Sequence, residues 1–324
     1  MATIQDVAER AGVTVTTVSR LLNGRVRVSP KTREKIEAVM EELDYRPNEI
    51  ARSLSKKNSN MIGLIVPSAS NYFFCKVINS VERNAALHGY KLMLCVSNHE
   101  LKKELEYFSI LRANKVAGVI LTSHTQSLEE HLNFDAPLIS FDRMLSNSIS
   151  SVSSDNYMGG KTAANHLLER GCESPVFFSD SMQVNMYAKF RFDGFDETFR
   201  ERGIQAIMYS APTERFISAR YEDCIKDFFK SHPKTDGIFT SNDIIAAQIL
   251  RYCVKNNIKV PENLKVVGFD GIDMSEFVTP SITTICQPIE DICRYAVEYI
   301  KGFSPDSTAV NKVFPVELRQ GEST

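Results

Sequence analysis

A chain of 324 residues with 43% hydrophobic and 24% charged residues has the composition of a soluble globular protein, and its length predicts two or three folding units. No apolar run approaches the roughly 18 to 20 residues needed to cross a bilayer, and the N-terminal residues lack the apolar core of a secretory signal, so a cytoplasmic protein without a membrane partner is expected. The seven scattered cysteines contain no C-x-x-C pair, which argues against a disulfide framework and a zinc site.

The net charge of −2 is unevenly distributed along the chain. Residues 1–33 hold six Lys or Arg against two acids, a surplus of four, so the remainder sums to −6. A basic end on an acidic body suggests that this end meets an anion, although a solvated basic face is the simpler interpretation.

Three short helices are predicted in the first 45 residues. Thr3 begins a capping box for a helix over residues 4–11, and Thr14 is a natural N-cap for a second helix with apolar residues at 18, 21 and 22. Ser29 as N-cap and Pro30 at the first helical position then begin a third helix. The pattern is helix, three-residue turn, helix, followed by a third helix that completes a small core.

The second helix leaves Val15, Thr16, Ser19 and Arg20 free to face outward. Val and Thr methyls can pack on a thymine methyl, hydroxyls can serve bases or phosphates, and an Arg fork fits guanine O6 and N7. These side chains suit a major groove, but a structural helical domain with an ordinary solvated face would show the same pattern.

The motifs Asp-Val-Ala at 6–8, Ala-Gly-Val at 11–13, Thr-Val-Ser-Arg at 17–20, Pro-Lys-Thr-Arg-Glu-Lys at 30–35 and Tyr-Arg-Pro-Asn at 45–48 closely resemble the headpiece of the lactose-repressor and galactose-repressor family. The resemblance implies that the second helix is the recognition helix and that Val15, Thr16 and Arg20 read the operator. It also implies that Asn23 and residues 32–35 lie near phosphates.

Residues 48–55 can form a helix of only two turns, too short to be stable alone in water. In the resembling family this hinge helix orders when two copies pair over the minor groove of a palindromic operator, and the leucine at the place of Leu54 enters between base pairs. The expected organisation is a helix-turn-helix headpiece at 1–46, a hinge helix and linker at 47–60, and a body at 61–324. The predicted DNA-contacting residues are Thr3, Thr14, Val15, Thr16, Thr17, Ser19, Arg20, Asn23 and Leu54.

From residue 61 onward, short apolar runs alternate with helical patterns. Buried parallel strands are predicted at 61–66, 91–96, 116–121 and 138–141, and a second set at 176–178, 237–239 and 264–269. This α/β pattern predicts two doubly wound units, in which ligands bind outside the carboxyl ends of the strands. Polar and aromatic residues follow these runs and could hold a polyol in a cleft, although each one alone is more often a cap or turn residue.

The body resembles the type I periplasmic-binding-protein fold used by the same family, in which the chain crosses three times between lobes. The resemblance implies a first lobe at about 61–157 and 288–324 and a second at about 158–287. Arg191 matches the family's effector-binding arginine, and further positions match cleft residues. The predicted effector-binding residues are Asn71, Phe73, Phe74, Ser123, Asp142, Asp155, Arg191, Asn242, Asp270 and Gln287.

Residues 140–143 and 153–160 look most like sucrose-operon repressors, which suggests a sucrose-related ligand. The chain contains no Trp, so the ring that stacks on sugar in some members is absent. Phe216 could replace that ring, or the pocket could favour a charged group, with Arg143, Lys189 and Arg191 facing a phosphate. Surface ion pairing explains the same three residues equally well.

The expected protein is therefore a repressor of a sugar-utilisation operon, controlled by a sugar or sugar phosphate acting as inducer or corepressor. It is expected to bind palindromic operator DNA as a homodimer or tetramer and to need no cofactor. A global carbon-catabolite regulator with a phosphocarrier protein as corepressor is the alternative. The acids Asp142, Asp155, Asp243 and Asp270 could serve a glycosidase, but the sequence has no G-x-S-x-G, P-loop or H-E-x-x-H motif, so no enzyme is expected.

Overall fold

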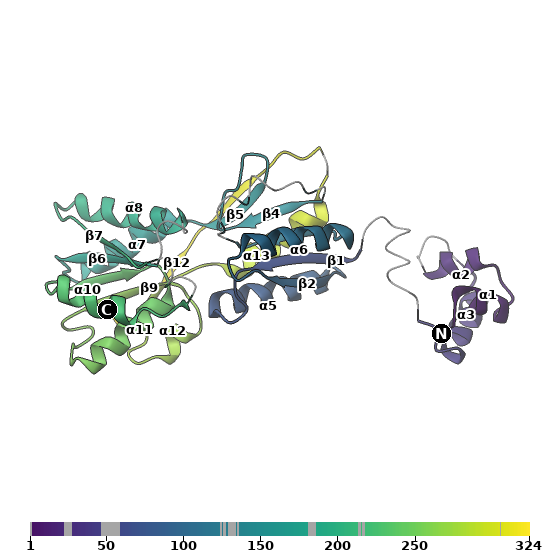
Figure 1. Cartoon of the computed structure of the whole chain (residues 1–324), viewed down its shortest axis with the longest axis horizontal. Helices are drawn as coiled ribbons and strands as arrows, with labels where there is room; N and C mark the ends of the chain where they lie inside the picture. Colours follow the sequence, from purple (N-terminus) through teal and green to yellow (C-terminus); the bar gives the residue numbers. More distant parts are fainter. Residues whose placement is uncertain are drawn as a thin grey trace. The chain divides into compact units, whose positions relative to one another are not determined.

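The structure is a computed structural model that describes residues 2–22, 28–46, 59–123, 125, 128, 134, 136–180, 186–212, 215, 218–304 and 306–324, with only the backbone at 186. It contains two compact units, Met1–Asn60 and Met61–Thr324, which are described separately (Figure 1). Among the described residues, no helix has the length and hydrophobicity needed to span a membrane.

The first unit contains the three predicted helices α1 (Ile4–Arg10), α2 (Val15–Leu22) and α3 (Pro30–Glu42). The capping box at Thr3 is present, and the Ser29 hydroxyl accepts from the Thr32 N–H at the start of α3. The shared core buries one face of each helix and consists of Val7, Ala8, Ala11, Val18, Ile36 and Val39. The capping residues and the apolar faces therefore specify the same three-helix arrangement. This confirms the predicted helix-turn-helix class.

The second unit contains two six-stranded sheets in separate lobes (Figure 1). The first sheet has the order β11-β5-β4-β3-β1-β2, and every pairing in it is parallel. Its strands are β1 (Met61–Val66), β2 (Lys91–Val96), β3 (Gly118–Leu121), β4 (Leu138–Phe141), β5 (Ser150–Ser154) and β11 (Asn311–Phe314). The helices of this lobe are α5 (Tyr72–Leu87), α6 (Leu101–Ala113) and α13 (Ile289–Gly302).

The second sheet has the order β12-β10-β9-β8-β6-β7, with β12 antiparallel to β10 and the other pairs parallel. Its strands are β6 (Pro175–Ser179), β7 (Ile207–Ser210), β8 (Gly237–Thr240), β9 (Lys265–Asp270), β10 (Thr283–Cys286) and β12 (Glu317–Arg319). Its helices are α7 (Asn156–Glu169), α8 (Met186–Arg200), α10 (Glu222–Ser231), α11 (Asp243–Lys255) and α12 (Met274–Phe277).

Alternate residues of each central strand face opposite helical layers. In β1, Leu64 packs with α5 and α13, whereas its neighbour Ile65 packs with α6. In β6, Phe178 packs with α10 and α11, whereas Phe177 packs with α7 and α8. Both faces of each sheet are thus buried, which explains why these strands are continuous apolar runs.

The chain crosses between the lobes three times, after β5, after β10 and between β11 and β12. The expected first-lobe range 288–324 is too long, because Glu317–Arg319 pairs with Thr283–Cys286 in the second sheet. Pro315 has no N–H to continue a ladder, and the next apolar residues, Val316 and Leu318, pack on the core of the second lobe. The end of the chain therefore belongs to the second lobe.

The strand β5 was not predicted, because four of its five residues are serines. The strand is nevertheless buried, and its hydroxyls have partners in the surrounding protein. Ser150 donates to the Tyr299 hydroxyl at 2.9 Å, and Ser154 donates to Gln287 Oε1 at 2.7 Å. Buried polar groups with partners carry little penalty, so hydroxyls replace apolar side chains here.

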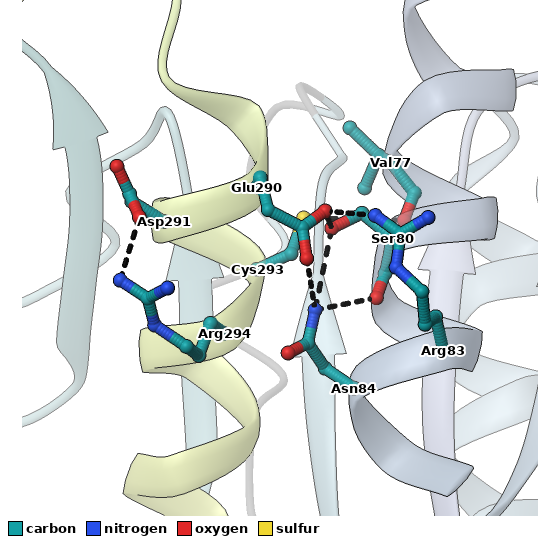
Figure 2. A network of polar contacts seen from close by, with 8 residues as sticks. All are labelled: Val77, Ser80, Arg83, Asn84, Glu290, Asp291, Cys293 and Arg294. Carbon is teal, nitrogen blue, oxygen red and sulfur yellow. Dashed lines mark hydrogen bonds and ion pairs between the residues drawn. The ribbon is translucent and has the colours of Figure 1, made fainter. Parts of the chain in front are cut away.

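A polar network joins α5 to α13 inside the first lobe (Figure 2). Glu290 accepts from the Ser80 hydroxyl at 2.7 Å and from the Asn84 amide at 3.0 Å, and it also pairs with Arg83. Burial alone would raise the pKa of Glu290, but these three hydrogen bonds outweigh it and lower that pKa. The network connects two helices about 200 residues apart in the sequence, so α13 packs against α5 as part of the first lobe.

We expect Glu290→Gln to lower the free energy of unfolding by about 1 kcal/mol, because a hydrogen-bonded carboxylate that is about half exposed is replaced by an amide. Urea denaturation at pH 7 measures this change. The control is Asp291→Asn on the same helix, whose carboxylate pairs only with Arg294 one turn away among the described residues and is expected to contribute little. Equal stability of the two variants would show that the network does not hold the helices together.

Candidate functional site

The outward face of α2 carries the predicted DNA-reading side chains. Val15, Thr16 and Arg20 are exposed, whereas Val18 on the opposite face is buried and Ser19 is half-buried. Unlike Arg10, which is held by Glu42 at 2.6 Å, Arg20 forms no ion pair with any described residue. Its guanidinium is therefore available to a ligand outside the unit.

The other predicted DNA-contacting residues have local roles or are not described. The Thr14 hydroxyl accepts from the Thr17 N–H at 3.2 Å and shares a hydrogen bond with the Thr17 hydroxyl at 2.9 Å. Thr3 bonds to Asp6 in the capping box. Asn23 and Leu54 lie outside the described residues, and so does the predicted hinge helix.

A cavity of about 310 Å³ lies in the second unit and is lined from both lobes. From the first lobe come residues after β1, β2 and β4. From the second lobe come residues after β6, β8 and β10, at the end of β9, in α8 and before α10. The lining residues discussed below are Asn71, Phe73, Phe74, His99, Asp142, Asp180, Arg191, Tyr221, Ser241, Asn242, Asp270 and Gln287.

Arg191 is the central polar residue of this cavity and is only 4% exposed. Its Nε donates to Asn156 Oδ1 at 2.7 Å, and one terminal nitrogen donates to the Ser241 carbonyl at 2.6 Å. The other terminal nitrogen lies 3.7 Å from Asp142 Oδ2, across the gap between the lobes. The guanidinium also stacks over the Phe269 ring at 3.6 Å, a cation–π contact that covers one of its faces.

A close helix crossing positions Arg191. A Cβ built on Gly160 of α7 would lie 2.0 Å from the Arg191 carbonyl oxygen, and one built on Gly194 of α8 would lie 2.1 Å from the Tyr157 carbonyl oxygen. The backbones of α7 and α8 are therefore in direct contact, which only glycine permits. This contact determines where the backbone of Arg191 lies relative to α7.

Three buried carboxyl groups surround the guanidinium: Asp142, Asp180 and Asp270. Burial raises the pKa of each of them although Arg191 acts in the opposite direction, and it brings the pKa of Asp180 to about 6. Gln287 donates to Asp270 at 2.8 Å, but Asp142 Oδ1 is buried without a hydrogen-bond partner among the described residues. An unpartnered buried carboxylate oxygen costs free energy that a ligand hydroxyl could recover.

Most of the predicted effector residues line the cavity together. These are Asn71, Phe73, Phe74, Asp142, Arg191, Asn242, Asp270 and Gln287. Ser123 and Asp155 do not line it: the Ser123 hydroxyl donates to the buried Glu104, and Asp155 caps α7 by accepting from the Met158 N–H at 2.9 Å. Phe216 lies outside the described residues.

The sequence interpretation missed Asp180, Tyr221 and His99, all of which line the cavity. Asp180 could have been found, because it directly follows β6, which ends one residue beyond the predicted strand at 176–178. Tyr221 and His99 follow no pattern that separates them from loop residues. Among the residues that the structure describes, no group of three or more His, Cys, Asp or Glu side chains is arranged to hold a metal ion.

We expect Asp180 to make stability depend on pH. Because the folded chain holds the Asp180 proton more tightly than the unfolded chain, its stabilising contribution is complete below the ordinary pKa of 3.8 and is lost as the pH rises through about 6. The groups facing it are Arg191 on α8, Tyr221 before α10, and Ser241 and Asn242 after β8. Asp180→Asn removes the titration, so the stability of the parent relative to this variant should fall by about 2 kcal/mol between pH 4.5 and 7.5.

Urea denaturation at four or five pH values measures this difference. Asp227→Asn is the control, because Asp227 is exposed on α10 and pairs with Lys230 at 3.4 Å. The stability difference between the parent and Asp227→Asn should stay constant over the same pH range. A constant difference for Asp180→Asn as well would contradict the raised pKa.

Two family models match the chain. Residues 3–48 match bacterial regulatory proteins of the lacI family, and residues 164–324 match a periplasmic binding protein-like domain. The chain is 38% identical over 324 residues to the sucrose operon repressor of Streptococcus mutans serotype c, covering 100% of this chain and 99% of that protein. It is 37% identical over 292 residues to the ribose operon repressor of Halalkalibacterium halodurans, covering 90% and 87%.

The fold is similar to a solved structure of the lac repressor dimer bound to operator and the anti-inducer ONPF. The TM-score is 0.87 at 24% identity, with 99% of this chain and 98% of that chain covered. The headpiece and the two-lobed body therefore occur together in a known fold.

A headpiece that matches bacterial regulatory proteins, joined to a periplasmic binding protein-like domain in a chain that matches an operon repressor over its whole length, defines a transcription repressor and not an enzyme. The sequence similarity over the whole length then gives the family. The chain belongs to the lacI family of bacterial regulatory proteins.

Proposed function

We propose that this repressor controls a sugar-utilisation operon and that a sugar or sugar phosphate, of a class related to sucrose, regulates its binding to DNA. The observation that carries the proposal is the cavity, because Arg191 of the second lobe faces Asp142 of the first across it. A ligand that donates hydroxyls to these carboxyls and accepts from the guanidinium would bridge the lobes and so change their relative position. The sucrose and ribose operon repressors among the relatives support a sugar ligand.

The DNA side of the proposal rests on the exposed face of α2. Val15, Thr16 and Arg20 of two headpieces would read the two halves of a palindromic operator, which requires a homodimer or a larger assembly. Leu54 of each copy would enter the minor groove between the headpieces. Ligand binding would change the spacing of the headpieces, with a coupling free energy of about 1 to 3 kcal/mol that must act in both directions.

The test is an operator-binding titration with and without candidate sugars. The full chain is mixed with palindromic duplexes, and a thermal-shift panel covers sucrose, fructose, ribose and their phosphates. We expect one ligand both to raise the melting temperature and to change operator affinity by about 5- to 150-fold. Failure to prefer any palindrome over random DNA would contradict the assigned headpiece role. Operator binding that responds to a phosphocarrier protein and to no sugar would instead favour the carbon-catabolite alternative.

A further inference from the structure

The charge of the ligand can be inferred from the groups around the cavity, and this inference rests on the proposed function. We infer that the cavity takes an uncharged polyol and rejects the phosphate ester of the same sugar. The proposed function leaves both classes open, so the inference narrows the effector of the same site.

Acidic groups outnumber basic ones in the cavity wall. Of the described lining residues, Arg191 is the single Lys or Arg, whereas Asp142, Asp180 and Asp270 carry carboxyl groups. Two of the five N–H groups of Arg191 already donate to Asn156 and the Ser241 carbonyl, and its charge already faces Asp142 at 3.7 Å. A phosphate group would therefore meet three acids and one cation that they already share.

Three further cations of the body, Lys76, Lys189 and Arg143, have protein partners. Lys76 of α5 bridges to the second lobe, where its Nζ lies 2.7 Å from Asp273 Oδ1 and donates to the Gly271 carbonyl at 3.1 Å. Lys189 is exposed on α8 and lies 4.0 Å from Asp193, and Arg143 donates to the Thr125 carbonyl. Neither Lys189 nor Arg143 lines the cavity. The residues of the body that the structure does not describe include no Lys or Arg.

The N-termini of α5, α10 and α11 lie at the cavity and could in principle attract an anion. Side chains cap α5 and α11, and α10, which begins after the lining residue Tyr221, has Glu222 and Asp223 in its first turn. Asn71 begins α5 and accepts from the Phe73 N–H at 2.9 Å. Asn242 begins α11 and accepts from the Ile245 N–H at 3.0 Å, and the next residue, Asp243, places a buried carboxyl group in the first turn. The positive ends of these helices are thus already matched by protein oxygens.

The hydrogen-bonding capacity of the wall favours the same ligand. Asp142 Oδ1 is buried without a partner among the described residues, and Asp180 Oδ2 receives a long contact of 3.4 Å from Asn242. These oxygens need donors. Each sugar hydroxyl supplies one O–H donor, whereas an ionised phosphate ester adds only acceptors where it replaces a hydroxyl.

The acids of the cavity also predict how the discrimination changes with pH. Burial raises the pKa of Asp180 to about 6, so this carboxyl is largely neutral at pH 5.5 and largely charged at pH 8. The groups facing it are Arg191, Tyr221, Ser241 and Asn242. A phosphate ester also loses its second proton near pH 6. Both the ester and Asp180 therefore become more negative as the pH rises, and the repulsion between them increases. The preference for the free sugar should therefore be larger at pH 8 than at pH 5.5.

Isothermal titration of the full chain tests the inference with three pairs of probes: fructose and fructose 6-phosphate, ribose and ribose 5-phosphate, and sucrose and sucrose 6-phosphate. Titrations are made at pH 8 and constant ionic strength, and operator release is recorded in parallel. We expect at least one free sugar to bind and its phosphate ester to bind at least tenfold more weakly. Equal or tighter binding of the ester overturns the inference and leaves the proposed function standing as a sugar-phosphate sensor. A chain that binds no member of any pair, with its operator complex unchanged, overturns both.

Asp180→Asn shows whether charge is the cause. Removing one acid from the wall should lower the ratio of the affinity for the free sugar to that for its phosphate ester at least threefold. The main cause should be stronger binding of the ester. Asp227→Asn, an acid on the exposed face of α10, should leave that ratio as in the parent. A ratio unchanged by Asp180→Asn overturns the electrostatic explanation. The melting temperature of each variant, measured first, establishes that it is folded.

Discussion

Replacement of Arg191 by methionine is expected to abolish the response to ligand while the chain still binds operator. The substitution keeps most of the apolar stem over Phe269 but removes the donors to Asn156 and Ser241 and the charge facing Asp142. Ligand affinity should fall at least 100-fold, because the one cation of the described wall and its fork of donors are lost together.

The same substitution should also lower stability. Three buried carboxyl groups would lose their only nearby cation in the described wall, and removing one partner of a buried ion pair typically costs about 3 to 5 kcal/mol. Isothermal titration, urea denaturation and an operator gel shift separate the two effects. Lys189→Met, an exposed substitution on the same helix, should change neither. If the Arg191→Met variant binds sugar with the affinity of the parent and is released from operator DNA in the same way, the cavity is not the ligand-binding site.

Arg20→Ala should have the second large effect, a loss of operator specificity. Each Arg fork on a guanine contributes about 1 to 3 kcal/mol of discrimination, and a dimer presents two such forks. Affinity for operator should therefore fall by about 100-fold or more, while binding to random DNA changes less because it depends mainly on phosphate contacts. Competition gel shifts at one fixed salt concentration measure the ratio.

The matched control for this prediction is Arg10→Ala. Arg10 is an exposed cation of the same headpiece, but it is held by Glu42 at the α1–α3 contact and does not lie on α2. Its removal should change the affinity for operator and for random DNA by a similar small factor. If Arg20→Ala behaves in the same way as Arg10→Ala, α2 does not read the operator through this residue.

Much of the fold could be predicted because buried parallel strands are continuous apolar runs between helical patterns. Met61–Val66, Lys91–Val96 and Leu138–Phe141 begin and end where the sequence predicts. Ser150–Ser154 could not be recognised, because its burial depends on partners such as Tyr299 and Gln287 that lie more than 130 residues away. Glu317–Arg319 is only three residues long, and its place in the second sheet depends on pairing with Thr283–Cys286.

The sequence predicts those residues of the candidate site that are placed there by the course of the backbone. Position after a strand identifies Asp142, Asn242 and Asp270, because parallel strands deliver their carboxyl ends to one edge. The same rule also selects Ser123, whose hydroxyl is instead used by Glu104, since the rule does not say where a side chain points. Arg191 lies inside a helix, where no periodicity marks it, and only the resemblance to a family identified it.

The contact between α7 and α8 has a further consequence for the site. Gly160 and Gly194 allow the two backbones to touch, and Arg191 lies on α8 immediately above that contact. Only the hydrogen atoms of these glycines separate the two backbones. A methyl group at either position, as in an alanine substitution, would push the helices apart and move the guanidinium away from Asn156. The proposed recognition of a sugar would thus depend on two residues that have no side chain with which to touch it.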